Sequence, residues 1–256
     1  MSTPPFTVTV LGSGTSTGVP MVGCSCPVCS SDDLRDRRSR ASILIETDGR
    51  FIVVDTSTDL RHQALSLRIP RIDAILFTHD HADHVNGIDD MRGFYFHHHQ
   101  MVPCYGTAET MSSLCRKFAY IFTHQPESGY PQILTPRVIE GEFTLFGLPI
   151  LPIALPHGQG MTTAFRIGPF AYVTDCSSIP EDRFPLLGGV DTLLIDGLRY
   201  TPHPNHLNIP GAISLAGRLG VRRTILTHLT HEVSARDDSR LPAGVEFAWD
   251  GMTIPF

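Results

Sequence analysis

Three histidines and two aspartates fall within the six residues from His79 to His84, and both side-chain types are metal ligands. The stretch reads THDHADH from Thr78, and it directly follows a mostly apolar run that predicts a buried strand. Neutral imidazole and carboxylate groups bind zinc, manganese or iron at neutral pH. With the spacing H-x-H-x-D-H, one pair of ligands can point one way from a loop and a second pair another way. The motif therefore predicts a loop that holds two cations close together, with a solvated histidine-rich loop as the alternative.

Three more apolar, strand-like runs each end in a residue that can bind a metal. Residues 151–156 lead into His157, residues 170–174 into Asp175 and residues 224–227 into His228. In layered α/β folds, ligands gather where strand ends and loops meet. One such residue alone is more often a turn residue, but three of them beside H-x-H-x-D-H argue for a shared site.

The seven side chains divide into two sets with one shared member. His79, His81 and His157 suit one cation, Asp83, His84 and His228 suit a second, and Asp175 can bridge them. Zinc, manganese and iron all accept such ligands. We therefore expect a dinuclear site with two divalent ions, Mn²⁺ or Zn²⁺, with Fe²⁺ as a further option.

The motif and its distant partners resemble the metallo-β-lactamase superfamily over almost the whole chain. This resemblance implies an α/β fold, the αββα sandwich, in which two mixed sheets face each other and helices lie outside. The metal site would run along one edge. Asp55 ends the strand-like residues 51–54, where the superfamily usually has an aspartate that braces the metal loop. A plain turn at the strand end is the alternative for Asp55.

Length and composition favour a single domain over residues 1–256, because no linker, repeat or low-complexity tract divides the chain. No apolar run approaches the roughly 20 residues of a membrane span, and residues 1–9 show no secretory signal. We therefore expect a cytoplasmic protein with no membrane partner. The formal net charge of −6 disfavours a large nucleic-acid surface, although bound cations can still attract a small anion.

The coarse pattern alternates strands with helices. Strands are expected at residues 7–11, 42–46 and 51–54, and helices at residues 107–118 and 209–219. Pro210 lies near the first turn of the last helix, where proline is tolerated.

Cys24, Cys26 and Cys29 form a C-x-C-x-x-C cluster in a loop at residues 23–29. Such spacing can wrap one tetrahedral zinc ion, which needs a fourth ligand. His231 is the natural fourth ligand because it lies three residues after His228, on a segment that must reach the metal edge. A structural Zn²⁺ there would anchor the N-terminal loop to the C-terminal region. Three unrelated reduced cysteines are the alternative.

Two further motifs give weaker signals. The glycine-rich residues 12–18 lack the Gly-Lys-Ser/Thr of a P-loop and depart from G-x-G-x-x-G. We expect a tight turn that brings the backbone near the metal site, where exposed amides could help to hold an anion. The run His97-His98-His99 has no ligand spacing, and we interpret it as a loop or a weak metal scavenger.

The two ends of the chain narrow the resemblance to the PhnP-type cyclic phosphodiesterases. Gly18-Val19-Pro20 before the cysteine cluster is similar to the start of that family, and a more specific match lies in ILTHLTH (225–231), LPxGxE (241–246) and DGMxI (250–254). His206, after Asn205, matches a catalytic histidine of the family. The resemblance implies a two-metal phosphodiesterase, often manganese-dependent, that acts on phosphoribosyl 1,2-cyclic phosphate. It also implies a separate structural zinc and raises the expectation of a homodimer.

Two divalent ions would activate a shared water for in-line attack on phosphorus, and the leaving alkoxide would then need a proton. The family match makes His206 the expected general acid, because imidazole titrates in a suitable range. Asp175 would set the spacing of the ions. For His206, a surface histidine in a proline-rich turn is the alternative. Residues 89–99 and 129–140 depart from the family and could shape the pocket. The identity of the small anionic phosphodiester substrate is therefore left open.

Three rival functions share parts of the pattern. A tRNase Z-like RNA phosphodiesterase has the same metal set but typically adds a Lys/Gly-rich arm, which is not visible here. A thioester hydrolase of the glyoxalase II type usually adds a helical C-terminal domain, whereas the last residues here are strand-like. A PqqB-like non-catalytic accessory or carrier protein shares the cysteine cluster but loses part of H-x-H-x-D-H, which is complete here.

Overall fold

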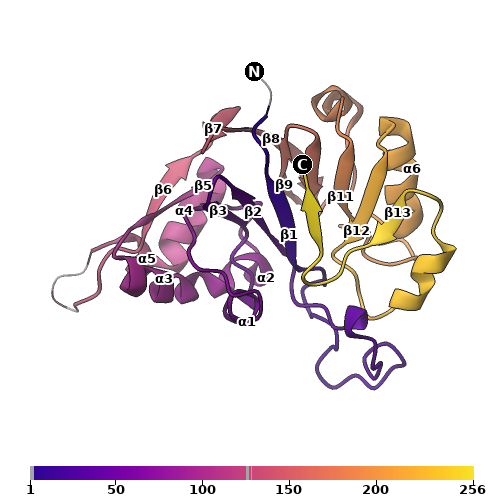
Figure 1. The fold of residues 1–256 in the computed structure, drawn as a ribbon, viewed down its shortest axis with the longest axis horizontal. Helices are drawn as coiled ribbons and strands as arrows, with labels where there is room; N and C mark the ends of the chain where they lie inside the picture. Colours follow the sequence, from indigo (N-terminus) through magenta and orange to yellow (C-terminus); the bar gives the residue numbers. More distant parts are fainter. Residues whose placement is uncertain (1–2, 125–126, 128) are drawn as a thin grey trace.

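The fourteen strands of the computed structural model, which describes residues 3–124, 127 and 129–256, form two sheets (Figure 1). The first sheet contains β1 (Thr7–Gly12), β2 (Ser42–Thr47), β3 (Arg50–Val54), β4 (Ala74–Leu76), β5 (Val102–Gly106), β6 (Leu134–Val138) and β14 (Thr253–Pro255). The second contains β7 (Phe143–Leu145), β8 (Leu148–His157), β9 (Gly160–Ile167), β10 (Phe170–Val173), β11 (Thr192–Asp196), β12 (Arg223–Thr227) and β13 (Val245–Phe247).

The two sheets have the same design. Their orders are β14-β1-β2-β3-β4-β5-β6 and β7-β8-β9-β10-β11-β12-β13. In each order, three antiparallel pairings are followed by three parallel ones. Parallel strands end at the same edge, so each sheet brings several strand ends together there.

Helices cover the outer face of each sheet. Beside the first sheet lie α1 (Leu60–Ser66), α2 (Ala82–Val85), α3 (Met91–His98), α4 (Ala108–Lys117) and α5 (Ala119–Phe122), and beside the second lies α6 (Ile209–Leu219) (Figure 1). Short 3₁₀ segments are η1 (Leu34–Asp36), η2 (Asn86–Asp90), η4 (Glu181–Leu187) and η5 (Ala235–Arg240). The expected αββα sandwich is confirmed. Within the described ranges, no helix is long and apolar enough to span a bilayer.

Alternate residues of each strand pack into different cores. In β3, Ile52 and Val54 face the second sheet, whereas Val53 packs against the helices of the first. In β11, Leu194 lies between the sheets and Ile195 packs under α6. Burying each such side chain contributes about 1.5–3 kcal/mol, compared with about 0–1 kcal/mol for a surface ion pair. The cores between these layers therefore fix the strand ends.

Most predicted elements are confirmed to within two residues, and their ends have local causes. Helix α6 spans the predicted residues 209–219. The Asn208 side chain accepts from the amide of Gly211 at its start, and Gly220 ends it with a φ of 68°. The predicted helix at 107–118 is α4, which Thr107 caps by accepting from the amide of Thr110.

The prediction of a loop at the three consecutive histidines is wrong. His97 and His98 form the last turn of α3, and His99 ends that helix with a φ of 52°. The helix forms because Met91 is buried and Phe94 packs with it against the core outside the first sheet. In the described part of the chain, no potential metal-binding group includes these histidines.

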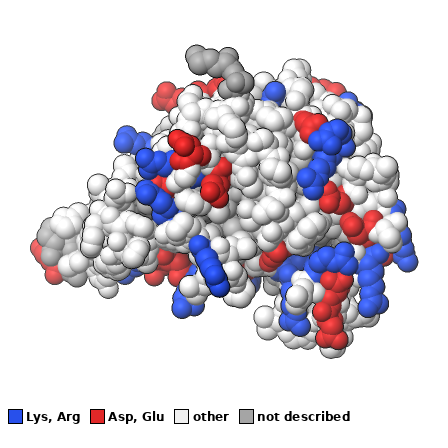
Figure 2. Space-filling model, viewed as in Figure 1, with Lys and Arg blue, Asp and Glu red and all other residues white. Residues whose placement is uncertain are grey.

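Charged side chains are mixed over the surface. On the face shown in Figure 2, Lys and Arg lie among Asp and Glu rather than in one basic band. Several form pairs, such as Arg222 with Asp191 at 2.8 Å and Arg223 with Glu246 at 2.6 Å. This distribution gives the visible face no extended basic surface.

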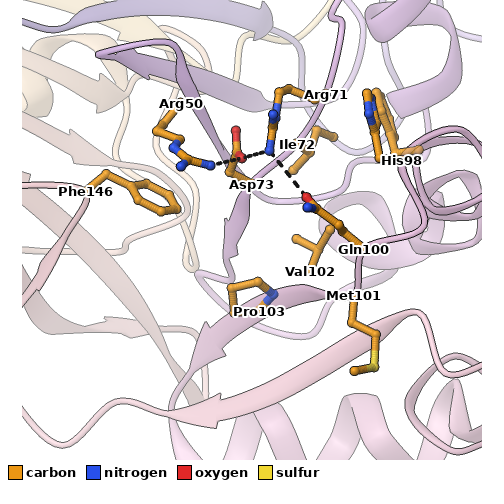
Figure 3. A pocket seen from close by; sticks show the side chains of 11 residues that line it. Arg50, Arg71, Ile72, Asp73, His98, Gln100, Met101, Val102, Pro103 and Phe146 are labelled. Atoms are coloured by element: carbon orange, nitrogen blue, oxygen red, sulfur yellow. Dashed lines mark hydrogen bonds and ion pairs between the residues drawn. The ribbon is translucent and has the colours of Figure 1, made fainter.

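A small hollow of about 220 Å³ lies near the start of β3, β4 and β5 (Figure 3). Asp73 accepts there from Arg50 Nη1 at 3.0 Å and from the amide of Phe51 at 2.9 Å, and it also pairs with Arg71. Arg71 reaches Gln100 as well. The hollow is therefore at the opposite ends of these strands from the histidine motif, and its carboxylate is fully engaged by the protein.

Asp250 connects three distant segments at the other edge. Its Oδ1 accepts from the amide and hydroxyl of Ser13 at 2.9 and 2.8 Å. Its Oδ2 accepts from the amide of Ser39 at 2.7 Å and also from the Ser39 hydroxyl. The carboxylate thus joins the glycine-rich segment, the segment after η1 and the turn before β14.

We predict that Asp250→Ala destabilises the protein, because it leaves several partly buried donors without an acceptor. Each buried polar group left unpaired costs about 1–3 kcal/mol, so we expect the free energy of unfolding to fall by at least about 2 kcal/mol. Urea denaturation would measure this, with Asp182→Ala at an exposed carboxylate as the matched control. Equal stability of the two variants would contradict the role of Asp250.

Candidate metal centre

The predicted metal ligands all lie at the C-terminal ends of strands, on one edge of the sandwich. His79 and His81 follow β4; Asp83 and His84 lie in α2, which comes next; His157 ends β8; Asp175 follows β10; and His228 follows β12. Asp55, the predicted bracing residue, follows β3 at the same edge. Both sheets therefore contribute side chains to one cluster.

Three of these residues adopt the left-handed backbone conformation directly after a strand. Asp55, Asp175 and His228 have φ values of 66°, 52° and 59°. This region is uncommon for residues with a side chain, although Asp and His tolerate it better than most. Such a conformation costs about 1–3 kcal/mol and persists where the surrounding structure enforces it, often at functional sites. Here it turns each side chain towards the shared edge.

Asp175 lies between two groups of ligands. Its Oδ2 is 3.9 Å from His79 Nε2 and 3.8 Å from His157 Nε2, and His157 Nε2 is 3.2 Å from His81 Nδ1. Its Oδ1 is 3.3 Å from the Nε2 atoms of both His84 and His228. The structure therefore brings all the predicted ligands of the first group to one Asp175 oxygen.

The second group is completed by Asp83. Its Oδ2 lies 3.3 Å from His84 Nε2 and 3.8 Å from His228 Nε2. In each group, the potential ligand atoms all lie within 4.8 Å of one another. The two predicted sets are thus present as two groups that share Asp175.

The donor atoms fit divalent cations. His79 Nε2, His84 Nε2 and His228 Nε2 are buried and have no hydrogen-bond partner among the described residues. Leaving such atoms unpaired is costly unless another group satisfies them. Ligands about 2.0–2.1 Å from a tetrahedral zinc ion lie about 3.3 Å apart, which is close to several separations above. Imidazole and carboxylate donors suit Zn²⁺, Mn²⁺ and Fe²⁺ alike.

Hydrogen bonds behind the histidines turn their free nitrogens towards the centre. Asp55 Oδ2 accepts from His84 Nδ1 at 2.7 Å and from the hydroxyl of Thr78 at 2.7 Å. The Thr78 hydroxyl in turn accepts from His79 Nδ1 at 2.9 Å, so it connects the same carboxylate to a second imidazole. Asp55 therefore braces the motif loop, and the proton on each Nδ1 leaves Nε2 free for a cation.

The local charges favour a carboxylate surrounded by imidazoles. Burial alone would raise the pKa of Asp175, but the imidazoles of His228 and His84 hold that pKa well below its usual range. Burial lowers the pKa of His79 and of His157, which keeps these imidazoles neutral. Burial opposes protonation of His84 as well, but Asp175 and Asp55 outweigh it and raise its pKa. A cation in the second group would therefore compete with a proton.

The cysteine cluster meets His231 as expected from its spacing. The Sγ atoms of Cys24 and Cys26 are each 3.4 Å from His231 Nδ1, and all four potential ligand atoms, including Cys29 Sγ, lie within 4.8 Å of one another. A hydrogen bond from the amide of Cys29 and one with His231 lower the pKa of Cys26 to about 6. Ligands about 2.3 Å from a tetrahedral zinc ion lie about 3.8 Å apart, so the cluster fits zinc.

A buried ion pair fastens the neighbouring chain segments. Arg38, whose side chain is 1% exposed, lies 3.3 Å from Asp36. Its Nη1 donates to the carbonyl oxygens of Thr230 and Val233 at 3.2 and 2.8 Å. Asp36 also accepts from the amide of Ala235 at 2.7 Å. The segment after the cysteine cluster is therefore tied to the segment that follows His228.

His206 lies beside both groups. Its ring centroid is 5.0 Å from that of His157 and 4.8 Å from that of His228. Its Nδ1 donates to Asp196 Oδ2 at 2.8 Å, and its side chain is 12% exposed. His203 lies farther out, with its ring centroid 5.1 Å from that of His206. The nitrogen Nε2 of His206 is thus the one left for a molecule at the centre.

Asp196 is a site residue that the sequence interpretation missed. It is fully buried at the end of β11, next to His206. The signal was present, because Thr192-Leu193-Leu194-Ile195 is another apolar run that ends in a carboxylate. The same pattern had already marked Asp175 and His228.

The expectation that the glycine-rich turn offers free amides to an anion is wrong at four positions. The amide of Ser13 donates to Asp250, and those of Gly14, Thr15 and Gly18 donate to carbonyl oxygens of Ser39, Leu229 and Thr15. The turn does lie near the centre, because Gly14 pairs with Leu229, the residue after His228. These four amides bond to the protein rather than facing a ligand.

Comparisons with known proteins agree with this geometry. The profile of the family described as "Beta-lactamase superfamily domain" matches residues 50–229. A solved structure of a new diphosphatase from the PhnP family is 39% identical, with a TM-score of 0.92 and coverage of 98% of this chain and 97% of that chain.

Two curated relatives are also similar. An octanoyltransferase of Porphyromonas gingivalis is 38% identical over 95% of this chain, which spans about half (50%) of that protein's length. Coenzyme PQQ synthesis protein B of Methylobacterium nodulans is 30% identical over 73% of this chain and 71% of that protein. The extent and identity of these matches, on the fold described above, show that the chain belongs to the metallo-β-lactamase superfamily of hydrolases and, within it, to the PhnP family.

Proposed function

We propose that this hydrolase is a dinuclear-metal phosphodiesterase that acts on a small phosphodiester, such as the cyclic phosphate of a phosphoribosyl compound. The observation that carries the proposal is the position of Asp175, whose two oxygens face two separate groups of ligands. Two cations bound to the two oxygens of one carboxylate would lie close enough to act on the same substrate. When bound, they would lower the pKa of a water between them and neutralise charge that builds up on phosphate oxygens.

The residues of the chain supply the rest of the chemistry. Asp175 would hold one cation with each of its oxygens, and Asp55 fixes the orientation of His84 and, through Thr78, of His79. With a proton on both ring nitrogens, His206 would give the Nε2 proton to a leaving oxygen and keep the Nδ1 proton, which it donates to Asp196. Its place beside both metal groups supports this role over that of a surface histidine.

Several observations favour a small substrate that contains phosphorus. The 39% identical member of the PhnP family is described as a diphosphatase, which is a phosphorus–oxygen hydrolase. The face in Figure 2 mixes acidic and basic side chains. A protein that binds the phosphate backbone of RNA would present extended positive charge. We therefore favour a small phosphodiester over an RNA, and the complete ligand set favours catalysis over an accessory role. A cytoplasmic location and a homodimer stay expectations.

The proposal can be tested with a panel of substrates. It would contain phosphoribosyl 1,2-cyclic phosphate, 2′,3′-cyclic nucleotides, bis(p-nitrophenyl) phosphate and a precursor tRNA, each assayed with Mn²⁺, Zn²⁺ and Fe²⁺. We expect turnover of small diesters and none of the tRNA. Cleavage of the tRNA alone would favour the RNA phosphodiesterase, and no turnover of any phosphodiester would reject the proposal.

We predict three cations per chain in protein purified without chelator, because two groups share Asp175 and the cysteine cluster forms a third. Elemental analysis would count them. Asp175 and Asp55 raise the pKa of His84, and this imidazole must lose a proton to bind a cation. When the pH falls below that raised pKa, we expect the group of Asp83, His84 and His228 to release its cation first. A folded, active protein with no metal at its cysteines would contradict the structural zinc.

We predict that Asp175→Asn abolishes turnover with little loss of stability, whereas Cys26→Ser mainly lowers stability. The first change removes the shared charge, and the second removes a ligand from a site that supports folding. For Cys26→Ser we expect a Tm at least about 5 °C lower, since about 2 kcal/mol shifts the Tm of a chain of this size by roughly 4–8 °C. Thermal melts and rates on both variants would measure this. A lower Tm in Asp175→Asn, together with lost turnover at an unchanged Tm in Cys26→Ser, would contradict these roles.

We predict that His206→Ala affects poor leaving groups most. An alkoxide needs a proton to leave, whereas p-nitrophenolate leaves almost unaided. The rate on a cyclic phosphodiester should therefore fall by about 10²–10⁴, and the rate on bis(p-nitrophenyl) phosphate much less. His203→Ala is the matched control at a neighbouring imidazole. Equal losses on both substrates would assign His206 to phosphate binding, and loss of a cation would make it a ligand.

A further inference from the structure

A single buried carboxylate lies behind both His206 and His228. Asp196 Oδ2 accepts from His206 Nδ1 at 2.8 Å, while its Oδ1 lies 4.0 Å from His228 Nδ1. This Oδ1 and His228 Nδ1 are both buried without a hydrogen-bond partner among the residues that the structure describes. Asp196 Oδ2 also accepts from the amide of Cys176 at 3.2 Å, which fixes the carboxylate to the segment directly after Asp175.

We propose that Asp196 is a positioning residue that holds the general acid and a metal ligand at a fixed separation, one with each oxygen. The inference rests on the proposed function, in which His206 faces the leaving group and His228 faces a cation. This carboxylate would keep His206 at a fixed distance from the second metal group.

The hydrogen bond to His206 decides which of its nitrogens can react. A carboxylate that accepts from Nδ1 keeps a proton there and fixes the ring orientation, so Nε2 points away from the carboxylate. The His206 ring also stacks on that of His228, with the planes at 14° and the centroids 4.8 Å apart. Without Asp196, the ring would lose the polar contact that stops it from turning over.

His228 would use the other oxygen of Asp196. When its Nε2 binds a cation, the one remaining ring proton lies on Nδ1, which faces Asp196 Oδ1. A contact about 1 Å shorter than the present 4.0 Å would be a hydrogen bond. Histidines that bind metals usually donate their other nitrogen to such a partner, so a bound cation would complete the pair.

The first sheet already contains such an aspartate behind two imidazoles. Asp55, which follows β3, accepts from His84 Nδ1 and, through the Thr78 hydroxyl, supports His79. Asp196, which ends β11, would serve the second sheet in the same way. Each sheet thus provides one fully buried aspartate behind two imidazoles.

A different arrangement is a third cation between Asp196, His206 and His228, whose ligand atoms also lie within 4.8 Å of one another. The short bond between Asp196 and His206 Nδ1 argues against it, because both atoms are already satisfied. A cation at this position, added to the three predicted above, would raise the total to four per chain, which would overturn the positioning role.

The test uses metal-saturated Asp196→Asn, His206→Ala and the double variant, with Asp191→Asn, at the residue just before the same strand, as a control. We expect Asp196→Asn to lower kcat on the cyclic phosphodiester by about 10–100-fold and the rate on bis(p-nitrophenyl) phosphate by less than about threefold. In the His206→Ala background, Asp196→Asn should add no further selectivity between the substrates. Equal losses on both substrates would overturn the role through His206.

The role through His228 is measured without turnover. Asp196→Asn should weaken the second catalytic cation by about 10–100-fold, whereas His206→Ala and Asp191→Asn should leave its affinity unchanged. Unchanged affinity in Asp196→Asn would overturn this half of the proposal.

Histidine-selective ¹⁵N NMR of the zinc-loaded protein gives a readout that survives a folding failure of Asp196→Asn. We expect a protected, low-field Nδ1–H signal in the unmodified protein that disappears in His206→Ala. Its absence from the unmodified protein would overturn the proposal. If no phosphodiester is hydrolysed, the proposed function fails, but the NMR and metal-affinity results still decide the role of Asp196.

Discussion

The edge of the sandwich is organised around the carboxylate of Asp175. One oxygen faces His79 and His157, and the other faces His84 and His228, so a single side chain joins ligands from both sheets. Several of the surrounding nitrogens are buried without a hydrogen-bond partner among the described residues, an arrangement that is costly unless another group satisfies them. The backbone of Asp175 adopts a φ of 52° just after β10 and turns the side chain towards this position. The strain is sustained by the fully buried strands β10 and β11.

Support for this centre comes from layers of increasingly distant contacts. Asp55 and Asp196 lie behind the imidazoles and orient them. Farther out, His231 lies with the cysteines, three residues after His228, and Arg38 donates to the carbonyl oxygens of the same segment. The cysteine cluster is therefore a separate group that supports the segment after His228 and shares no residue with the two groups at Asp175. This separation explains why stability and turnover should respond to different substitutions.

The duplicated design of the sheets explains why one edge can hold so many ligands. Each sheet runs from antiparallel to parallel pairing in the same order, and the parallel strands end together. The hollow at the other ends of β3, β4 and β5 has a carboxylate too, but Asp73 is neutralised by two arginines. At the edge with the histidine motif, by contrast, Asp175 and Asp55 face imidazoles.

The sequence by itself determined which side chains could bind a metal and that they follow predicted strands, because residue type, spacing and strand-end position are local properties. It also implied the fold, through the resemblance of the motif and its distant partners to the metallo-β-lactamase superfamily. The contact of His231 with the cysteines joins residues more than 200 apart and needed the folded chain. Only the tertiary structure showed that Asp196 lies behind both His206 and His228, since residues 196 and 228 meet only when β11 and β12 pair. The amides of the glycine-rich turn were misjudged for the same reason. Two of the acceptors, Asp250 and Leu229, are more than 200 residues away in the chain and become neighbours only in the folded protein.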